Sequence, residues 1–268
     1  MQKKITSSQN NLIKKILTLK DKPKIRKKLG LFVIEGEREI RTAINNGYEI
    51  KNLLFTPEIF DSKKIESISK KKINIILITK KIYSKIAHRS NSEGLIALAK
   101  IKSHSLENLI LKNQKPLIVV AESIEKPGNI GAMLRTCEAA NVDAFLIADP
   151  KTDLYNPNIV RNSLGGIFSI QIGIESSKNI IEYLNNKKIS IFTATLKNSS
   201  PYTKLNYKDS TALVFGNESN GLTVNWEDSS IREINIPMLG ELDSMNVSVA
   251  TGIIVFEAVR QRNFILQN

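Results

Sequence analysis

Two polar, glycine-containing loops near the end of the chain have the composition of a ligand-binding site. The apolar run ALVFG (212–216) leads into NESNGL, and the apolar run INIP (234–237) leads into MLGELDSMN. The second loop opens into a long apolar-faced segment that predicts a helix over residues 246–263. Junctions between a strand, a loop and a helix present backbone N–H groups to a ligand. Two such junctions close together predict one small-molecule pocket, lined largely by backbone.

A third polar segment lies earlier, where the apolar run LIVVAES (117–123) is followed by KPGNIGAMLRTCEA. The pattern predicts a helix over residues 129–140 with Asn129 as its N-cap, and Gly128 and Gly131 allow close approach of the backbone. Arg135 follows nearly two turns later. Taken alone, this segment is also explained by a capped helix with a surface arginine. Cys137 falls on the apolar side of the helix and is expected in the core.

These segments, in this order, resemble motifs 1, 2 and 3 of the SpoU (TrmH-like) RNA 2'-O-ribose methyltransferases, a family of the SPOUT superfamily. Motif 1 is NIGAMLR (129–135), motif 2 is GNESNG (216–221) and motif 3 occupies residues 237–246. The family usually has Leu where this chain has Met245, an apolar residue of similar volume. The resemblance implies that S-adenosyl-L-methionine is the cofactor.

The resemblance also assigns roles to individual residues. The residues implied to bound the cofactor pocket are Leu196, Gly216, Ile236 and Met245. The residues implied to be catalytic are Asn129, Arg135, Glu218, Ser244 and Asn246. Core packing is the alternative explanation for Ile236 and Met245, and a turn with a helix-starting acid is the alternative for motif 2.

The role of Arg135 has two interpretations. Methyl transfer requires a hydroxyl placed in line, help with its deprotonation and exclusion of water. The resemblance gives Arg135 a central role, sometimes as the base, but a guanidinium with a pKa above about 12 accepts protons poorly. In the second interpretation, Arg135 holds the phosphate beside the target ribose and stabilises the developing alkoxide. Four residues are then expected to orient it by hydrogen bonds: Asn129, Glu218, Ser244 and Asn246. The sequence leaves both roles open.

The net positive charge of the chain lies entirely in its first half. Residues 1–110 carry 24 Lys and Arg against 10 Asp and Glu, whereas residues 111–268 carry 15 against 16. A solvated lysine-rich surface is one explanation, but so complete an asymmetry favours a nucleic-acid footprint. The candidate RNA contacts are Lys22, Lys24, Arg26, Lys27, Lys28 and, from a family-like segment at 156–166, Arg161. For Arg161 an ordinary surface arginine is the alternative.

The order of apolar segments predicts two α/β domains. In the first half, a helix over residues 8–20 is followed by strands at 31–36, 50–56, 73–78 and 94–99, and a helix at 37–47. The segments FVIEGEREIRTAI and Arg89–Gly94 resemble parts of the L30e-like RNA-binding domain. We expect this domain over residues 1–105, a linker at 106–116 and the SpoU methyltransferase domain over 117–268.

Strands alternate with helices from residue 117 onward, which predicts a parallel α/β sheet. The expected strands are 117–123, 144–149, 168–172, 189–195, 212–216 and 234–237, with helices near 157–164 and at 177–185 besides those above. The resemblance implies a deep trefoil knot in this domain and a homodimer, neither of which periodicity reveals.

Composition excludes several classes of protein. The sequence has no apolar run long enough for a membrane span, no secretory signal and a single cysteine, so a cytoplasmic protein without disulfides is expected. Both histidines, His88 and His104, precede residue 111, so the second half has no histidine base, and no metal site is expected. The resemblance implies 2'-O-methylation of structured RNA, with 23S rRNA the first choice. A tRNA methyltransferase and a non-catalytic ribosome-assembly factor are the alternatives.

Overall fold

The computed structural model describes residues 3–68, 73–88, 93–196, 199–228 and 230–263, and the chain divides into two compact units. Unit 1 comprises Met1–Lys102 and Asp153–Ser169, and unit 2 comprises Ser103–Thr152 and Ile170–Asn268. The chain therefore leaves unit 1, returns to it and leaves again. Residues 153–169 were expected in the second domain, whereas their contacts group them with unit 1.

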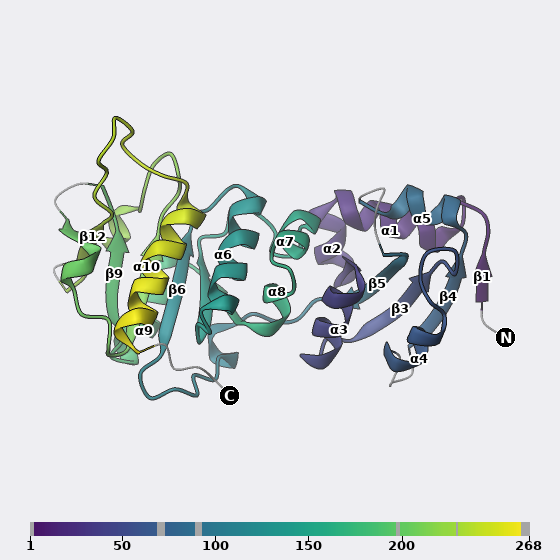
Figure 1. Ribbon diagram of the computed structural model, residues 1–268, viewed down its shortest axis with the longest axis horizontal. Helices are drawn as coiled ribbons and strands as arrows, with labels where there is room; N and C mark the ends of the chain where they lie inside the picture. Colours follow the sequence, from purple (N-terminus) through teal and green to yellow (C-terminus); the bar gives the residue numbers. More distant parts are fainter. Residues whose placement is uncertain (1–2, 69–72, 89–92, 197–198, 229, 264–268) are drawn as a thin grey trace. The chain divides into compact units, whose positions relative to one another are not determined.

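Unit 1 contains a mixed sheet of five strands within the described residues, in the order β1-β4-β3-β5-β2 (Figure 1). β4 is parallel to β1 and β3, and β5 is antiparallel to β3 and β2. The strands are β1 (Lys3–Ile5), β2 (Leu31–Glu35), β3 (Ile50–Phe55), β4 (Asn74–Ile78) and β5 (Leu95–Lys100). The helices are α1 (Asn11–Asp21), α2 (Pro23–Leu29), α3 (Glu37–Asn45), α4 (Lys63–Ile68), α5 (Lys80–Ile86), α7 (Pro157–Asn162) and α8 (Gly166–Ser169).

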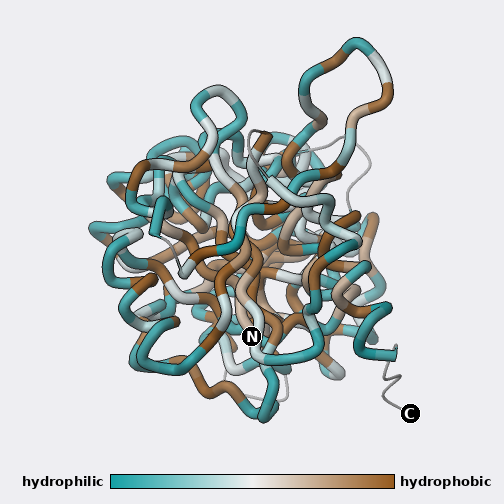
Figure 2. Tube along the Cα trace, turned by 90° about the vertical axis from the view of Figure 1, so that its left-hand side faces the viewer, coloured by the Kyte–Doolittle hydropathy of each residue, from teal (hydrophilic) through white to brown (hydrophobic). Residues whose placement is uncertain are grey.

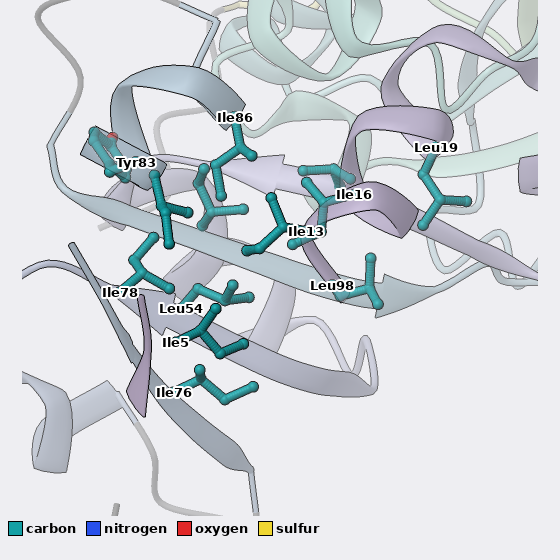
Figure 3. Close-up of a cluster of buried hydrophobic side chains, with 13 residues drawn as sticks. Ile5, Ile13, Ile16, Leu19, Leu54, Ile76, Ile78, Tyr83, Ile86 and Leu98 are labelled. Atoms are coloured by element: carbon teal, nitrogen blue, oxygen red, sulfur yellow. The ribbon is translucent and has the colours of Figure 1, made fainter. Parts of the chain in front are cut away.

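A core of unit 1 forms between the sheet and helices α1 and α5. Ile13, Ile16 and Leu19 recur at helical spacing along α1 and are fully buried. They pack in one cluster with strand residues that include Leu54 and Leu98 (Figure 3). The helix expected over residues 8–20 is thus confirmed as α1. The expected Arg89–Gly94 loop lies largely outside the described residues.

Residues 22–28, expected as an exposed basic cluster, mostly form helix α2. Arg26 is only 2% exposed, and its Nε lies 2.5 Å from Oδ2 of Asp153. Its NH1 donates to the carbonyl oxygens of Leu19 (2.5 Å) and Lys20 (3.0 Å). A guanidinium used in this way is not available to RNA, which corrects the prediction for Arg26. The other members of the cluster are exposed: Lys22, Lys24, Lys27 and Lys28.

Aromatic packing attaches residues 153–169 to the rest of unit 1. The rings of Phe32 and Tyr155 have centroids 4.2 Å apart, and those of Tyr48 and Phe168 are 5.0 Å apart in an edge-on arrangement. Phe168 lies in α8, so the strand predicted to begin at residue 168 is wrong there, and β8 begins only at Gln171. The local apolar pattern favours a strand at residue 168, but the aromatic contacts with unit 1 outweigh it.

Unit 2 is built on a parallel sheet, which confirms the predicted α/β class. Its seven strands, among the described residues, follow the order β10-β12-β9-β11-β6-β7-β8 (Figure 1). They are β6 (Leu117–Glu122), β7 (Ala144–Ala148), β8 (Gln171–Glu175), β9 (Ser190–Ala194), β10 (Ser200–Pro201), β11 (Thr211–Phe215) and β12 (Arg232–Asn235). The helices are α6 (Pro127–Ala139), α9 (Ser177–Asn186) and α10 (Val247–Gln261), and the 3-10 turns are η1 (Leu106–Asn108), η2 (Tyr202–Lys204) and η3 (Val224–Trp226).

Both faces of this sheet are covered, as buried parallel strands require. One face packs with α9 and η3 through residues such as Ile180 and Trp226, while α10 lies beside α6 and also contacts β11. In Figure 2 the segments in the middle of the view are mostly hydrophobic, and the outlying turns are mostly hydrophilic. No helix in the described ranges has the length and apolar content needed to cross a membrane.

The segment predicted as a linker is packed onto unit 2 over part of its length. Leu106, Leu109 and Leu111 contact the core cluster on the α9 face of the sheet. The side-chain amide of Gln171 exchanges two hydrogen bonds with the backbone of Ile110, at 2.8 and 2.6 Å. Most of this segment is therefore fixed as an added layer on the edge strand β8.

The buried ion pair of Arg26 leads to a stability prediction. Arg26→Met should lower the free energy of unfolding by about 3 kcal/mol, because Asp153 and two carbonyl groups lose their partner. Lys27→Met, one position along the same helix but exposed, should change it by less than about 0.5 kcal/mol. Chemical denaturation of the full chain measures both, and equal effects would contradict the structural role of Arg26.

Candidate active site

A cavity of about 670 Å³ lies in unit 2, where β9, β11 and β12 end. The chain runs outward from β6 through β7 to β8 and then returns to β9 on the other side of β6, with β11 inserted between the two. Ligands of parallel α/β sheets bind outside the carboxyl ends of the strands, at such a change of direction. The sequence-predicted residues that line the cavity are Leu196, Gly216, Glu218, Ile236, Ser244 and Met245.

The loop after β11 closes on itself at Gly216. Asn217 and Gly221 exchange two backbone hydrogen bonds, of 3.1 and 2.9 Å. A Cβ atom added to Gly216 would lie 2.5 Å from the carbonyl carbon of Gly221 and 2.6 Å from the nitrogen of Leu222. Only glycine fits this position, because the chain's own backbone occupies the space of a side chain.

Asn129 joins the three motifs through its side-chain amide. Its Nδ2 donates to Oε1 of Glu218, and its Oδ1 accepts from Nδ2 of Asn246 at 3.2 Å. Asn246 Oδ1 also accepts from the backbone N–H of Ser248 at 2.9 Å, so Asn246 caps α10, and the helix predicted over residues 246–263 is confirmed. These bonds connect the start of α10, helix α6 and the loop after β11.

Asn129 is not the N-cap of its helix, contrary to the prediction. Helix α6 begins at Pro127, which follows the cap residue Lys126 and occupies a position where its missing N–H is no loss. Asn129 lies inside the first turn and is buried. Its amide is therefore free of capping and can bridge Glu218 and Asn246.

The cavity lining has the charge of a site for a cation. It includes three carboxylates, those of Glu218, Glu227 and Glu233, and no Lys or Arg among the described residues. Three lining residues also carry a buried polar atom without a hydrogen-bond partner in the part of the chain that the structure describes: Thr193 Oγ1, Trp226 Nε1 and Asn235 Oδ1. Buried polar groups are normally paired, so these three atoms are exceptions in the wall of the cavity.

Sequence reasoning missed several of these residues. Thr193 and Trp226 lie in or beside apolar stretches and match none of the motifs, so only their unpartnered atoms identify them. Glu122 could have been identified from the sequence, because it is a carboxylate that ends an otherwise apolar strand. The structure buries it completely.

Comparison with known proteins identifies the family. Residues 116–256 match the SpoU rRNA methylase family, and residues 10–97 match the MRM3-like substrate binding domain. The first match spans more than half of the chain. The chain belongs to the SpoU rRNA methylase family. The resemblance found in motifs 1 to 3 is therefore confirmed.

Individual relatives are similar over almost their full length. The 23S rRNA (guanosine(2553)-2'-O)-methyltransferase RlmP of Bacillus subtilis is 26% identical over 254 residues, which cover 95% of this chain and 98% of that protein. A crystal structure of an RNA 2'-O ribose methyltransferase is 32% identical and has a TM-score of 0.83, over 97% of this chain and 99% of that one. The AdoMet-bound rRNA methyltransferase from Sinorhizobium meliloti has a TM-score of 0.89 at 26% identity, over 99% of both chains.

Arg135, the motif 1 arginine of this SpoU chain, is set apart from the hydrogen-bonded network, contrary to the expectation that Asn129, Glu218, Ser244 and Asn246 orient it by hydrogen bonds. It is exposed on α6 and makes no hydrogen bond or ion pair with any residue that the structure describes. Cys137, on the buried side of the same helix, is a core residue as expected, and burial raises the pKa of its thiol. Helix α6 thus presents a free guanidinium on one side and an unreactive thiol on the other.

Arg161 is held within unit 1. Its NH2 donates to Oδ1 of Asn158 at 3.0 Å, and its NH1 lies 3.0 Å from Nδ1 of the exposed His88. Lys20 lies near enough for its charge to interact with that of Arg161, and burial is the main cause that lowers the pKa of the Lys20 ammonium. Arg161 therefore belongs to a basic group on unit 1.

The closure of the loop at Gly216 yields a second prediction. Gly216→Ala should lower the free energy of unfolding by about 1 to 3 kcal/mol and open the loop, because the new methyl group collides with backbone. Gly240→Ala is the matched control, since nothing lies within 4 Å of its added Cβ, and it should be nearly neutral. Thermal unfolding together with hydrogen exchange of residues 217–223 measures the two effects. Comparable results for both variants would contradict the steric role of Gly216.

Proposed function

We propose that this protein transfers a methyl group from S-adenosylmethionine to a ribose 2'-hydroxyl of ribosomal RNA, with 23S rRNA as the first candidate. One observation carries the proposal: the cavity at the carboxyl ends of β9, β11 and β12 is lined by carboxylates and by all four expected cofactor residues. Membership of the SpoU family and the names of the relatives support the reaction and the RNA.

The chemistry of the cavity fits this cofactor. S-adenosylmethionine carries a sulfonium, an ammonium and a carboxylate group and no phosphate, so its net charge is positive and the three carboxylates of the lining attract it. A nucleotide cofactor with phosphates would meet only like charge there. The lining also includes side-chain amides and hydroxyls, those of Asn217, Ser244 and Thr195 among them, which match the amine, hydroxyl and ring-nitrogen groups of the cofactor.

The reacting methyl group is supplied already activated by the sulfonium. What remains for the protein is to place the hydroxyl and stabilise its developing charge. Arg135 is suited to this task because its guanidinium is exposed and free, and a planar fork of donors matches a phosphate or an alkoxide. Asn129, Asn246 and Glu218 join the loop after β11 to helix α6 and the start of α10, and Ser244 lines the cavity.

Unit 1 is proposed as the RNA-recruiting part. It holds most of the basic half of the sequence, and it contains the residues that match a substrate binding domain. The exposed ammonium groups of Lys22, Lys24, Lys27 and Lys28, together with Arg161, are the proposed phosphate contacts. Arg26 is not among them, since its guanidinium is buried.

A trefoil knot, a homodimer and a cytoplasmic location complete the proposal. In support of the knot, the chain runs from the central strand β11 out to β12 beyond β9 and then back to α10, which packs on α6 and β11. In support of the dimer, α10 exposes Val249 and Phe256, two apolar residues that a second copy would cover.

The function is tested by mapping 2'-O-methyl groups in total RNA by mass spectrometry, with and without this gene product. Loss of one 2'-O-methyl group in 23S rRNA is the expected result. Loss of a 2'-O-methyl group from tRNA instead would show that tRNA is the substrate. Cofactor binding without methyl transfer to any RNA would indicate a non-catalytic factor.

Because Arg135 is exposed and lies outside the cavity, a variant at this position can separate cofactor binding from methyl transfer. Arg135→Ala should leave the affinity for S-adenosylmethionine within a few fold, because Arg135 does not line the cavity. Methyl transfer should fall by about 100-fold or more, the usual scale for removal of a positioned catalytic group. Calorimetry and single-turnover transfer measure the two quantities, and Arg135→Lys tests the need for the planar fork. Undiminished transfer in Arg135→Ala would reduce Arg135 to a surface residue.

The exposed lysines of α2 and its cap residue lead to a prediction about how RNA affinity depends on salt concentration. Changing Lys22, Lys24, Lys27 and Lys28 to Gln should weaken RNA binding and lower the slope of log affinity against log salt, by roughly 0.7 to 0.9 for each phosphate that is no longer neutralised. Lys51→Gln with Lys100→Gln is the control, because both ammonium groups already pair with Glu49. A slope unchanged by the first set would remove these lysines from the RNA interface.

A further inference from the structure

Glu122 is a buried carboxylate outside the three motifs. It ends strand β6, is fully buried and forms no ion pair with a Lys or Arg of the described residues. It accepts hydrogen bonds from Ser177 Oγ (2.8 Å), from the backbone N–H of Thr223 (2.9 Å) and from Thr223 Oγ1 (2.6 Å). Burying a carboxylate costs free energy unless its oxygens accept hydrogen bonds. These bonds therefore stabilise Glu122, and they also hold Ser177 and Thr223 in place.

Thr223 ends the loop that follows β11. It precedes the 3-10 turn η3, yet its hydroxyl does not cap that turn and is committed to Glu122 instead. Its neighbour Leu222 is one of the residues packed against the backbone of Gly216. A displaced Thr223 would therefore displace the part of the loop that closes on Gly216.

The other side of the same loop is tied to the residue next to Glu122. Asn217 Nδ2 donates to the carbonyl oxygen of Ser123 at 3.0 Å, and Ser123 has a left-handed backbone with φ 52°, which a serine rarely adopts. Residues 122 and 123 thus bind both ends of the loop that carries Glu218. The turn after β6, with its left-handed Ser123, therefore holds one end of this loop in place through Asn217.

We propose that Glu122 is a positioning residue of the cofactor site, acting through Thr223. It sets the place of the loop over residues 216–223, and with it the cavity wall and the carboxylate of Glu218 that accepts from Asn129. This inference rests on the proposed function, which supplies S-adenosylmethionine as the ligand of that wall. Glu122 itself is not among the residues that line the cavity.

Ser177 provides a matched control, because it uses the same carboxylate from the opposite direction. It lies at the start of α9, is fully buried and shares its one hydroxyl proton between Glu122 and Oδ2 of Asp149, which lies 2.5 Å from its Oγ. Ser177 does not line the cavity, whereas Thr223 does, so hydrogen exchange measured without cofactor has to accompany the affinities. Removing its hydroxyl weakens the surroundings of Glu122 without touching the loop.

The test compares Thr223→Val, Thr223→Ser and Ser177→Ala in the full-length protein. Thr223 is exposed and Val has its shape, so the variant should fold while losing the hydroxyl bond. Thr223→Val should weaken S-adenosylmethionine binding by about 10-fold, the scale of one hydrogen bond to a charged group, and Thr223→Ser should restore it to within about two-fold. Ser177→Ala should lower the melting temperature but leave the affinity within about two-fold.

Hydrogen exchange without cofactor gives a second, independent readout. Thr223→Val should raise the exchange rates of backbone amides in residues 217–223, whereas Ser177→Ala should leave them unchanged. If wild-type protein binds no S-adenosylmethionine, the proposed function fails, but the exchange pattern still tests the positioning role. Equal loss of affinity in Thr223→Val and Ser177→Ala, or unchanged exchange in Thr223→Val, would overturn the role of Glu122.

Discussion

The side-chain amide of Asn129 is the constraint on which the candidate active site depends. Its nitrogen only donates and its oxygen only accepts, so Glu218 fits one end and the amide nitrogen of Asn246 fits the other. These partners lie 89 and 117 positions away along the chain. Because Asn246 also caps α10, the direction of that helix and the position of the loop after β11 follow from one set of hydrogen bonds.

Much of this site was predictable from the sequence, for reasons that are local. Asparagine before an apolar-faced run is a strong cap signal, and Asn246 does cap α10. Alternating apolar segments give the parallel sheet, and its strand ends gather the loops of motifs 2 and 3. The same local logic misplaced Asn129, because Pro127 starts the helix earlier and releases the asparagine for a long-range contact.

Residues whose role is set by distant partners were not predictable. Arg26 lies among exposed lysines in the sequence, and its burial depends on Asp153, which is 127 positions away. The sequence around Phe168 has the pattern of a strand, but its ring packs against those of Phe32 and Tyr48 in unit 1. Glu122 ends an apolar strand, but its partners Ser177 and Thr223 belong to separate later segments. Tertiary contacts decide each of these cases.

The return of residues 153–169 to unit 1 also sets an order of folding during synthesis. A domain made from one continuous segment can complete its core as soon as that segment has left the ribosome. Unit 1 lacks the ion-pair partner of Arg26 and two aromatic neighbours of Phe32 until residue 168 has emerged. By then β6, α6 and β7 have already been translated. The unit that is made first is thus completed only after part of the second has been made, so the side of Phe32 and Arg26 stays without these partners in the interval.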